Sequence, residues 1–187
     1  SIALNPLLFA LVEPARRWIV ARSALARRLE ARDDPLAALP TTIDAKYLAQ
    51  QVVLVGYGVV GRAIASALAA RDIPLVVVEQ SRERVGALRR EGRMAVAGDA
   101  VEPIVLVQAH IAEAGLLVIA ASESTDVRPM VATARALNPS IAIVARAANE
   151  EEARLLVADG IQRAIHARAA LAEAMTAAAV AVMRPAG

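Results

Sequence analysis

The residues from Val52 to Arg62 constrain the fold of this chain more than any other stretch. An apolar run of strand length ends at Val55 and meets three glycines, Gly56, Gly58 and Gly61, after which good helix formers follow. This G-x-G-x-x-G spacing between a strand and a helix is the dinucleotide-binding pattern. The first glycine permits the tight turn, the second lets a pyrophosphate approach the backbone, and the third lets the helix pack closely. The sequence therefore predicts phosphates bound at the N-terminus of that helix, where unpaired N–H groups and the positive end of the dipole lie.

The chain from residue 50 onward alternates between strand and helix patterns. Several predicted strands are continuous apolar runs, as expected for parallel strands that are covered on both faces. Regular alternation with short connections predicts right-handed crossovers and an α/β fold, a Rossmann-like doubly wound parallel sheet of about six strands. Strands are predicted at 52–55, 75–79, 94–97, 116–120, 141–144 and 163–165, and helices at 60–71, 82–91, 101–114, 125–137 and 149–158.

An acidic residue, Glu79, stands at the end of the second predicted strand, about 20 residues beyond the glycines. At this spacing a carboxylate accepts hydrogen bonds from ribose hydroxyls and repels a 2′-phosphate, which favours NAD or another adenine nucleotide over NADP. Arg82 and Arg84 follow it, and either could balance Glu79, contact an adenine or lie on the helix surface, which we favour. Arg146, just past the fifth predicted strand, would point into the cleft region, although a lone arginine is more often a surface residue.

Other polar residues follow the third and fourth predicted strands, at the edge where open α/β sheets bind ligands. Asp99 and Ser122 could contact a nucleotide there, or they could only cap the helices that follow them. The candidate nucleotide-binding residues are Gly56, Tyr57, Gly58, Val59, Val60, Gly61, Glu79, Gln80, Gly98, Asp99, Ala100, Ala120 and Ser122.

Catalytic groups are missing from these patterns. The chain has no cysteine, and neither His110 nor His166 belongs to a metal-binding or nucleophile-base pattern. Neither tyrosine, Tyr47 or Tyr57, has a lysine four residues later. Residues 167–187 are too few for a substrate domain. We therefore predict no catalytic residue, no metal ligand and no enzyme, and a nucleotide bound without chemistry suggests a sensor.

Charge divides the chain into a basic first part and a slightly acidic remainder. The net charge is +2, and residues 1–32 carry six arginines and two glutamates, a net of +4, which leaves −2 for the rest. This distribution, with few aromatics, argues against nucleic acid as a partner. The apolar residues 1–12 are shorter than the roughly 20 that span a bilayer. They suit either the end of a longer membrane helix, followed by cytoplasmic arginines, or an amphipathic helix.

Three regions are predicted on these grounds. Residues 1–48 form either the end of a transmembrane helix or an amphipathic helix, with a basic helical linker, residues 49–166 the nucleotide-binding domain, and residues 167–187 a C-terminal helix. The chain opens on Ser1 rather than Met, so we expect a piece of a longer protein. The C-terminal helix has few polar side chains, and a helix apolar nearly all round must be buried. It is therefore expected to contact a second copy.

Four motifs together resemble the RCK N-lobe, or TrkA-N domain. They are VLVGYGVVG at 53–61, VVEQS at 77–81, AGDA at 97–100 and IVARA at 143–147. The opening IALNPL at 2–7 is similar to the end of the last membrane helix in the monovalent cation:proton antiporter-2 family, the Kef-type and YbaL-like transporters.

The resemblance implies a regulatory domain, on the cytoplasmic side of a bacterial inner membrane, that gates potassium or proton movement in its own transmembrane domain. It implies a homodimer that binds NAD(H) or an AMP-like nucleotide over Gly56–Gly61, with Glu79 on the ribose and Gly98–Ala100 beside the adenine. Two alternatives stay open, the NAD-binding domain of an oxidoreductase and a soluble redox sensor that lacks its second domain.

Overall fold

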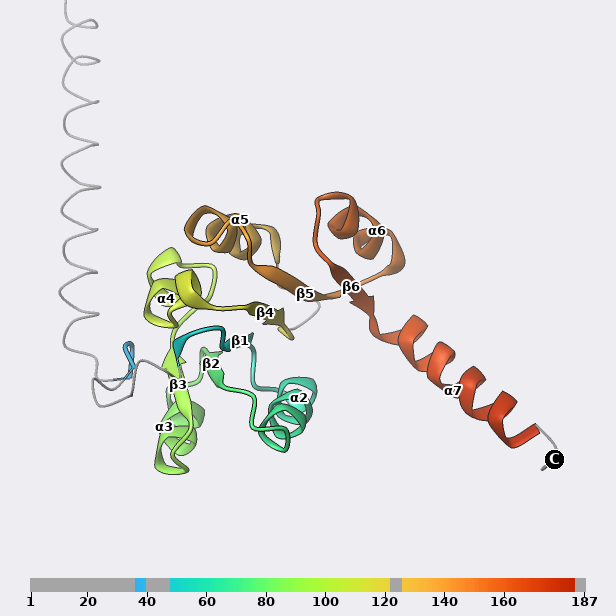
Figure 1. The fold of residues 1–187 in the computed structure, drawn as a ribbon, viewed down its shortest axis with the longest axis horizontal. Coiled ribbons are helices and arrows are strands. Elements are labelled where there is room, and N and C mark those ends of the chain that lie inside the picture. Colours follow the sequence, from blue (N-terminus) through green and yellow to red (C-terminus); the bar gives the residue numbers. More distant parts are fainter. Residues whose placement is uncertain (1–35, 40–47, 122–125, 184–187) are drawn as a thin grey trace, which may run out of the picture.

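The protein has a six-stranded, wholly parallel sheet with helices on both faces (Figure 1). The structure is a computed structural model and describes residues 36–39, 48–121 and 126–183. The strand order β3-β2-β1-β4-β5-β6 reverses direction between β1 and β4, which confirms the predicted Rossmann-like doubly wound fold. The strands are β1 (Val52–Val55), β2 (Leu75–Glu79), β3 (Met94–Ala97), β4 (Leu116–Ile119), β5 (Ala142–Ala147) and β6 (Arg163–His166).

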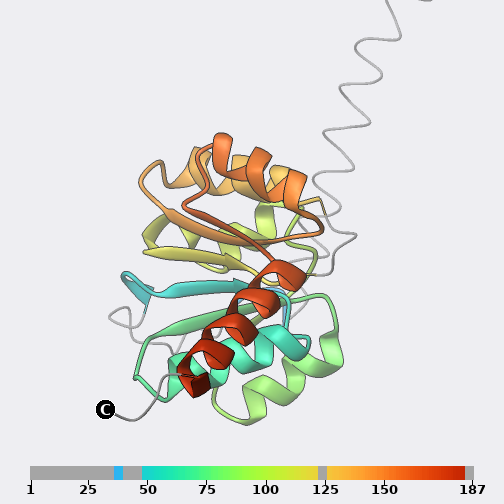
Figure 2. The same cartoon turned by 90° about the vertical axis from the view of Figure 1, so that its right-hand side faces the viewer.

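Two groups of helices cover the sheet on opposite sides (Figure 2). On one side α2 (Val59–Ala69) and α3 (Arg82–Arg90) pack through Ala65, Val85 and Leu88. The other side is covered by α4 (Pro103–Gln108), the 3₁₀ helix η2 (Ile111–Glu113), α5 (Arg128–Leu137) and α6 (Glu150–Ala158). The central strand β1 is buried along its whole length, which explains why its sequence is a continuous apolar run.

Several predicted boundaries are wrong. The helix predicted at 101–114 is split into α4 and η2, because Pro103 sets the start of α4 and His110 adopts a left-handed conformation with φ 55°. The strand predicted at 141–144 runs on to Ala147, because β5 pairs with β6 from Val144 to that residue. The helix predicted at 125–137 begins at Arg128, and the first residues of that prediction lie in the undescribed range 122–125.

A short segment before β1, residues Leu36–Leu39, covers the outer edge of β3. The backbone N–H of Ala97 donates a hydrogen bond to the carbonyl oxygen of Leu36 at 2.8 Å. Leu36 packs against the core on the α2 and α3 side of the sheet, whereas Leu39 packs against the core on the other side. The segment thus joins the two halves of the core across the sheet edge.

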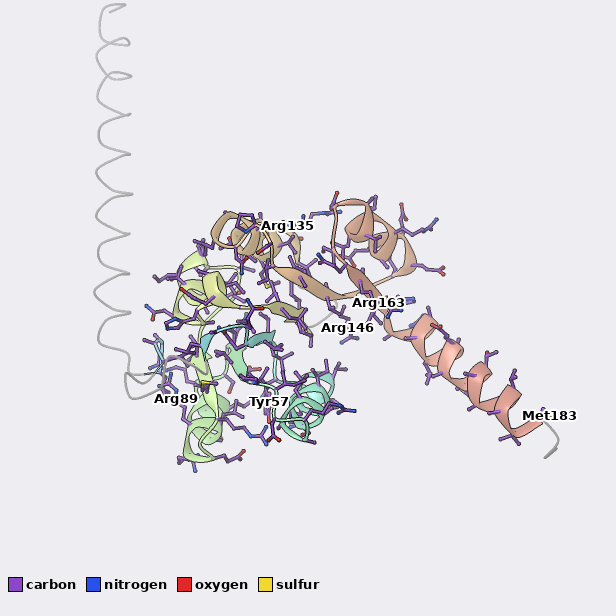
Figure 3. The ribbon with its side chains drawn as sticks, in the orientation of Figure 1. Tyr57, Arg89, Arg135, Arg146, Arg163 and Met183 are labelled. Atoms are coloured by element: carbon purple, nitrogen blue, oxygen red, sulfur yellow. The ribbon has the colours of Figure 1, made fainter. Side chains whose placement is uncertain are left out.

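The guanidinium group of Arg89 in α3 holds this segment in place (Figure 3). Its Nη2 donates to the carbonyl oxygens of Ala38 at 2.5 Å and Leu36 at 3.2 Å, and its Nε donates to Ala95 in β3 at 2.8 Å. One side chain therefore links α3, β3 and the chain that enters the domain. The rest of the predicted linker within residues 1–48, with its membrane-helix end, lies almost wholly outside the described residues.

The last helix, α7 (Ala167–Met183), leaves the body of the domain (Figure 1). None of its side chains is buried, and large apolar ones such as Leu171 and Met175 are 62% and 65% exposed. The prediction of a helix over Ala167–Met183 is confirmed. Because the described residues leave this apolar helix uncovered, its contact with a second copy stays a prediction.

Candidate functional site

The glycine loop after β1 has the tight geometry that its sequence predicts. Gly56 has φ +91°, a conformation that L side chains rarely adopt, and its amide donates to the carbonyl oxygen of Val78 at 2.9 Å. A Cβ on Gly61 would lie 1.9 Å from the carbonyl oxygen of Gly56, so only glycine lets α2 start so close to the strand. A Cβ on Gly58 would meet nothing within 4 Å. The first and third glycines are therefore needed by the fold, and the second leaves open space.

The N-terminus of α2 faces this open space without a side-chain cap. Gly58 is the N-cap residue, and it offers no side chain to accept a hydrogen bond. The first N–H groups of a helix have no partner within the helix, and the helix dipole adds positive charge there. Residues Gly58, Val59 and Val60 are exposed. This helix end can therefore bind an anion such as a phosphate group.

Glu79, the last residue of β2, holds the loop from the other side. Its side chain is mostly buried, and its Oε2 accepts a hydrogen bond from the backbone N–H of Tyr57 at 2.8 Å. Its Oε1 accepts from the backbone N–H of Ser81 at 3.0 Å and from Nη1 of Arg84 at 3.3 Å. The carboxylate is thus tied to the glycine loop and to the start of α3.

These elements surround a cavity of about 470 Å³ at the carboxyl edge of the sheet. It lies where the strand order reverses, between the ends of β1 and β4, which is the usual ligand position in this fold. The cavity brings together eleven of the thirteen candidate residues: Gly56, Tyr57, Gly58, Val59, Val60, Glu79, Gln80, Gly98, Asp99, Ala100 and Ala120.

Two candidates are not in this lining. Gly61 packs behind the loop, where it makes the turn possible rather than facing the cavity. Ser122 lies outside the described residues. Asp99 lines the cavity, and its Oδ1 accepts from the backbone N–H of Val101 at 3.0 Å. That bond closes a local turn, because the helix that follows begins only at Pro103.

Two arginines outside the candidate set also line the cavity, Arg84 and Arg146. Arg84 does so while paired with Glu79, although its side chain is 56% exposed. Arg146 lies inside β5 rather than beyond it and is labelled in Figure 3. Arg84 stands in the first turn of α3, five residues after Glu79, and its ion pair with that acid is one of the roles that the sequence left open. The site therefore has acidic groups by β2 and β3 and a basic group by β5.

We also searched the described part of the chain for a metal site and for a membrane-spanning helix. Within residues 36–39, 48–121 and 126–183, no three His, Cys, Asp or Glu side chains are grouped so that they could hold a metal ion. In the same ranges no helix has both the length and the apolar character that a membrane crossing requires.

The sequence of this chain matches a known family model and a curated relative. A family model described as the TrkA-N domain matches residues 52–167. YbaL of Escherichia coli (strain K12), a protein named as a cation/proton antiporter, is 35% identical over 176 residues. That alignment covers 94% of this chain and 30% of YbaL, so the chain spans less than a third of this relative.

Solved structures are similar as well. The crystal structure of the TrkA-N domain of the inner membrane protein YbaL from Escherichia coli is 34% identical, with a TM-score of 0.66, over 73% of this chain and 98% of that one. The Kef C-terminal domain of Shewanella denitrificans in AMP-bound form is 23% identical, with a TM-score of 0.58, over 72% of this chain and 82% of that one. The GsuK channel bound to NAD is 22% identical, with a TM-score of 0.59, over 85% of this chain and 27% of that one. The last two similarities concern the fold.

Proposed function

The chain belongs to the TrkA-N domain family, and from this membership we propose that it is the nucleotide-sensing regulatory domain of a monovalent cation/proton antiporter. The observation that carries the proposal is the cavity in which the bare N-terminus of α2 and the carboxylate of Glu79 face the same space. A phosphate suits the first group and a ribose suits the second, so together they select a nucleotide.

The nucleotide is an adenine nucleotide, NAD(H) or AMP. Its phosphates lie over Gly56–Gly61, its ribose hydroxyls donate to Glu79, and its adenine lies beside Gly98–Ala100. Two proteins of the same fold support this choice, one solved in AMP-bound form and the other bound to NAD. Gln80, Ala120 and Ser122 complete the binding set. No residue in it has a catalytic role, so the domain is a receptor and not an enzyme.

The proposed location is the cytoplasmic face of a bacterial inner membrane, where this chain continues from its own transmembrane transport domain. The similarity to YbaL supports it, because a match over 94% of the chain extends beyond the TrkA-N region into residues before β1. Potassium is the cation that we propose. The oxidoreductase and redox-sensor alternatives gain no comparable support from these relatives.

A homodimer is part of the proposal, with α7 as the contact. The helix has only two charged side chains, Arg168 and Glu173, and large apolar groups stand exposed along it. A second copy that presents the same apolar helix would remove this surface from water, which is favourable in proportion to the area buried. Nucleotide binding would then favour one arrangement of the dimer, by no more than its difference in affinity for the two arrangements.

Transport in vesicles that carry the full-length antiporter tests the regulatory role. Cation/proton exchange is measured with AMP, NAD and NADH added in turn on the side that exposes this domain. We expect the exchange rate to change with at least one nucleotide and to lose that response in a Glu79→Ala variant. The same rate with and without all three nucleotides would refute gating.

A further inference from the structure

The carboxylate of Glu79 is already partly used by donors of this chain. Each carboxylate oxygen offers about two lone pairs for hydrogen bonding. Oε1 accepts from Ser81 and Arg84, so both of its positions are filled, whereas Oε2 accepts, from the residues that the structure describes, only the N–H of Tyr57 and keeps one position. A ribose with two neighbouring hydroxyls needs one position on each oxygen. One donor must therefore leave Oε1 before both hydroxyls can bind.

The two donors on Oε1 differ in how easily they can leave. The N–H of Ser81 belongs to the backbone at the N-cap of α3, and its 3.0 Å bond is fixed by the end of the strand. Nη1 of Arg84 lies at 3.3 Å, on a long side chain that is 56% exposed. Only the arginine end of this ion pair is exposed, and holding a long, exposed side chain in one position costs entropy that is regained when it leaves. Arg84 is the donor that is exchanged at the lowest cost.

Resting on the function proposed above, we propose that Arg84 competes with the nucleotide for Glu79. Without a nucleotide its guanidinium group neutralises the mostly buried carboxylate, and a ribose that donates two hydroxyls displaces it from Oε1. A nucleotide with a single ribose hydroxyl uses the remaining position on Oε2 and leaves Arg84 in place. Arg84 thereby reduces the preference for ribose over deoxyribose and sets the affinity for the complete nucleotide.

Calorimetric titration of the 187-residue chain with AMP, 2′-deoxy-AMP and 3′-deoxy-AMP tests the competition. The measured quantity is the ratio of each deoxynucleotide's dissociation constant to that of AMP, which reports the gain from the second hydroxyl. Arg84→Met keeps an unbranched apolar stem and a similar helix propensity but has no donor. We expect this ratio to rise by about two- to fivefold in the variant, because the hydroxyl no longer replaces an ion pair.

Two further variants control for folding and charge. Arg84→Ala also lacks the donor, and it must raise the ratio by a similar factor if the competition is real. Arg90→Met removes a positive charge from an exposed residue of the same helix, and its ratio must equal that of the unmodified chain. Circular dichroism checks that all three variants are folded.

The outcomes separate this inference from the proposed function. If the unmodified chain binds none of the three nucleotides, and further titrations show that it binds neither NAD nor NADH, the proposed function is wrong and the inference falls with it. If it binds AMP and the ratio stays unchanged in both Arg84 variants, Arg84 does not compete and only the inference is wrong. If these variants lower the ratio instead, Arg84 holds the ribose rather than displacing it, which also overturns the inference.

Discussion

The carbonyl oxygen of Gly56 occupies the position that a side chain on Gly61 would need, 1.9 Å from where a Cβ would be. The first and third glycines of the loop are therefore too close for a side chain to fit between them. We expect Gly61→Ala to lower the free energy of unfolding by about 1–3 kcal/mol, because the loop must shift to admit the methyl group. Urea unfolding followed by circular dichroism measures the change, and a variant as stable as the original chain would contradict this contact.

Gly58→Ala should leave the stability of the fold nearly unchanged and weaken nucleotide binding. Its φ is −77° and an added Cβ meets nothing within 4 Å, so the free energy of unfolding should change by less than about 0.5 kcal/mol. The same methyl group would stand where the phosphates approach the backbone, and AMP affinity should fall by about tenfold or more. Calorimetry beside urea unfolding checks both effects. Unchanged affinity would place the phosphates elsewhere.

Glu79→Ala should weaken binding of AMP and NAD by about ten- to a hundredfold, since it removes the proposed acceptor of the ribose hydroxyls and the tie to Tyr57. Glu83→Ala serves as the matched control, because it removes an acid from the first turn of the neighbouring helix at an exposed position. Calorimetry compares the two variants. Equal affinities for both would exclude Glu79 from the site.

Arg89→Met should loosen Leu36–Leu39 from the edge of β3. The loss of its hydrogen bonds to Ala38 and Ala95 should lower the free energy of unfolding by about 1–3 kcal/mol. The amide of Ala97 should exchange with deuterium faster, because its acceptor on Leu36 is no longer held. Arg90→Met is the control, as Arg90 is exposed on the same helix. An Ala97 amide with unchanged protection would show that the segment does not need Arg89.

The double substitution Leu171→Glu and Met175→Glu places two charges on one face of α7, four residues apart. If α7 forms the dimer, analytical ultracentrifugation should show a shift from dimer to monomer, with thermal stability of the domain nearly unchanged because neither side chain is buried. Ile104→Glu in α4 is the control, an apolar side chain that is 41% exposed elsewhere. A dimer that survives the double substitution would exclude this face of the helix.

The sheet and most of the site were predictable because they depend on local patterns. Buried parallel strands produce apolar runs, and β1, β2 and β4 lie where the clearest of those runs are. The cavity lining follows from position as well, since residues at the carboxyl ends of parallel strands meet at one edge. Glu79 shows this clearly, because its place at the carboxyl end of β2 brings it to the cavity.

The features that the sequence did not predict are of two kinds. Some are contacts between residues far apart in the chain, and the others are breaks in the backbone pattern that no glycine or proline accompanies. No glycine or proline marks the break at His110, where φ is 55°, so the helical pattern ran through it. The pairing of Leu36 with Ala97 joins residues about 60 positions apart and leaves no periodic trace. Arg84 was taken for surface because its exposure is real, and only its direction toward Glu79 brings it into the cavity.

The position of Leu36–Leu39 on the outer edge of β3 bears on where this domain can be cut. A shortened chain that begins at Leu48 would keep every strand, yet it would leave N–H and C=O groups of β3 open to strands of other molecules. Such an edge promotes aggregation, and it lies next to the turn that lines the cavity. The smallest piece suited to ligand screening or crystallisation therefore starts at Leu36, upstream of the residues that match the family pattern.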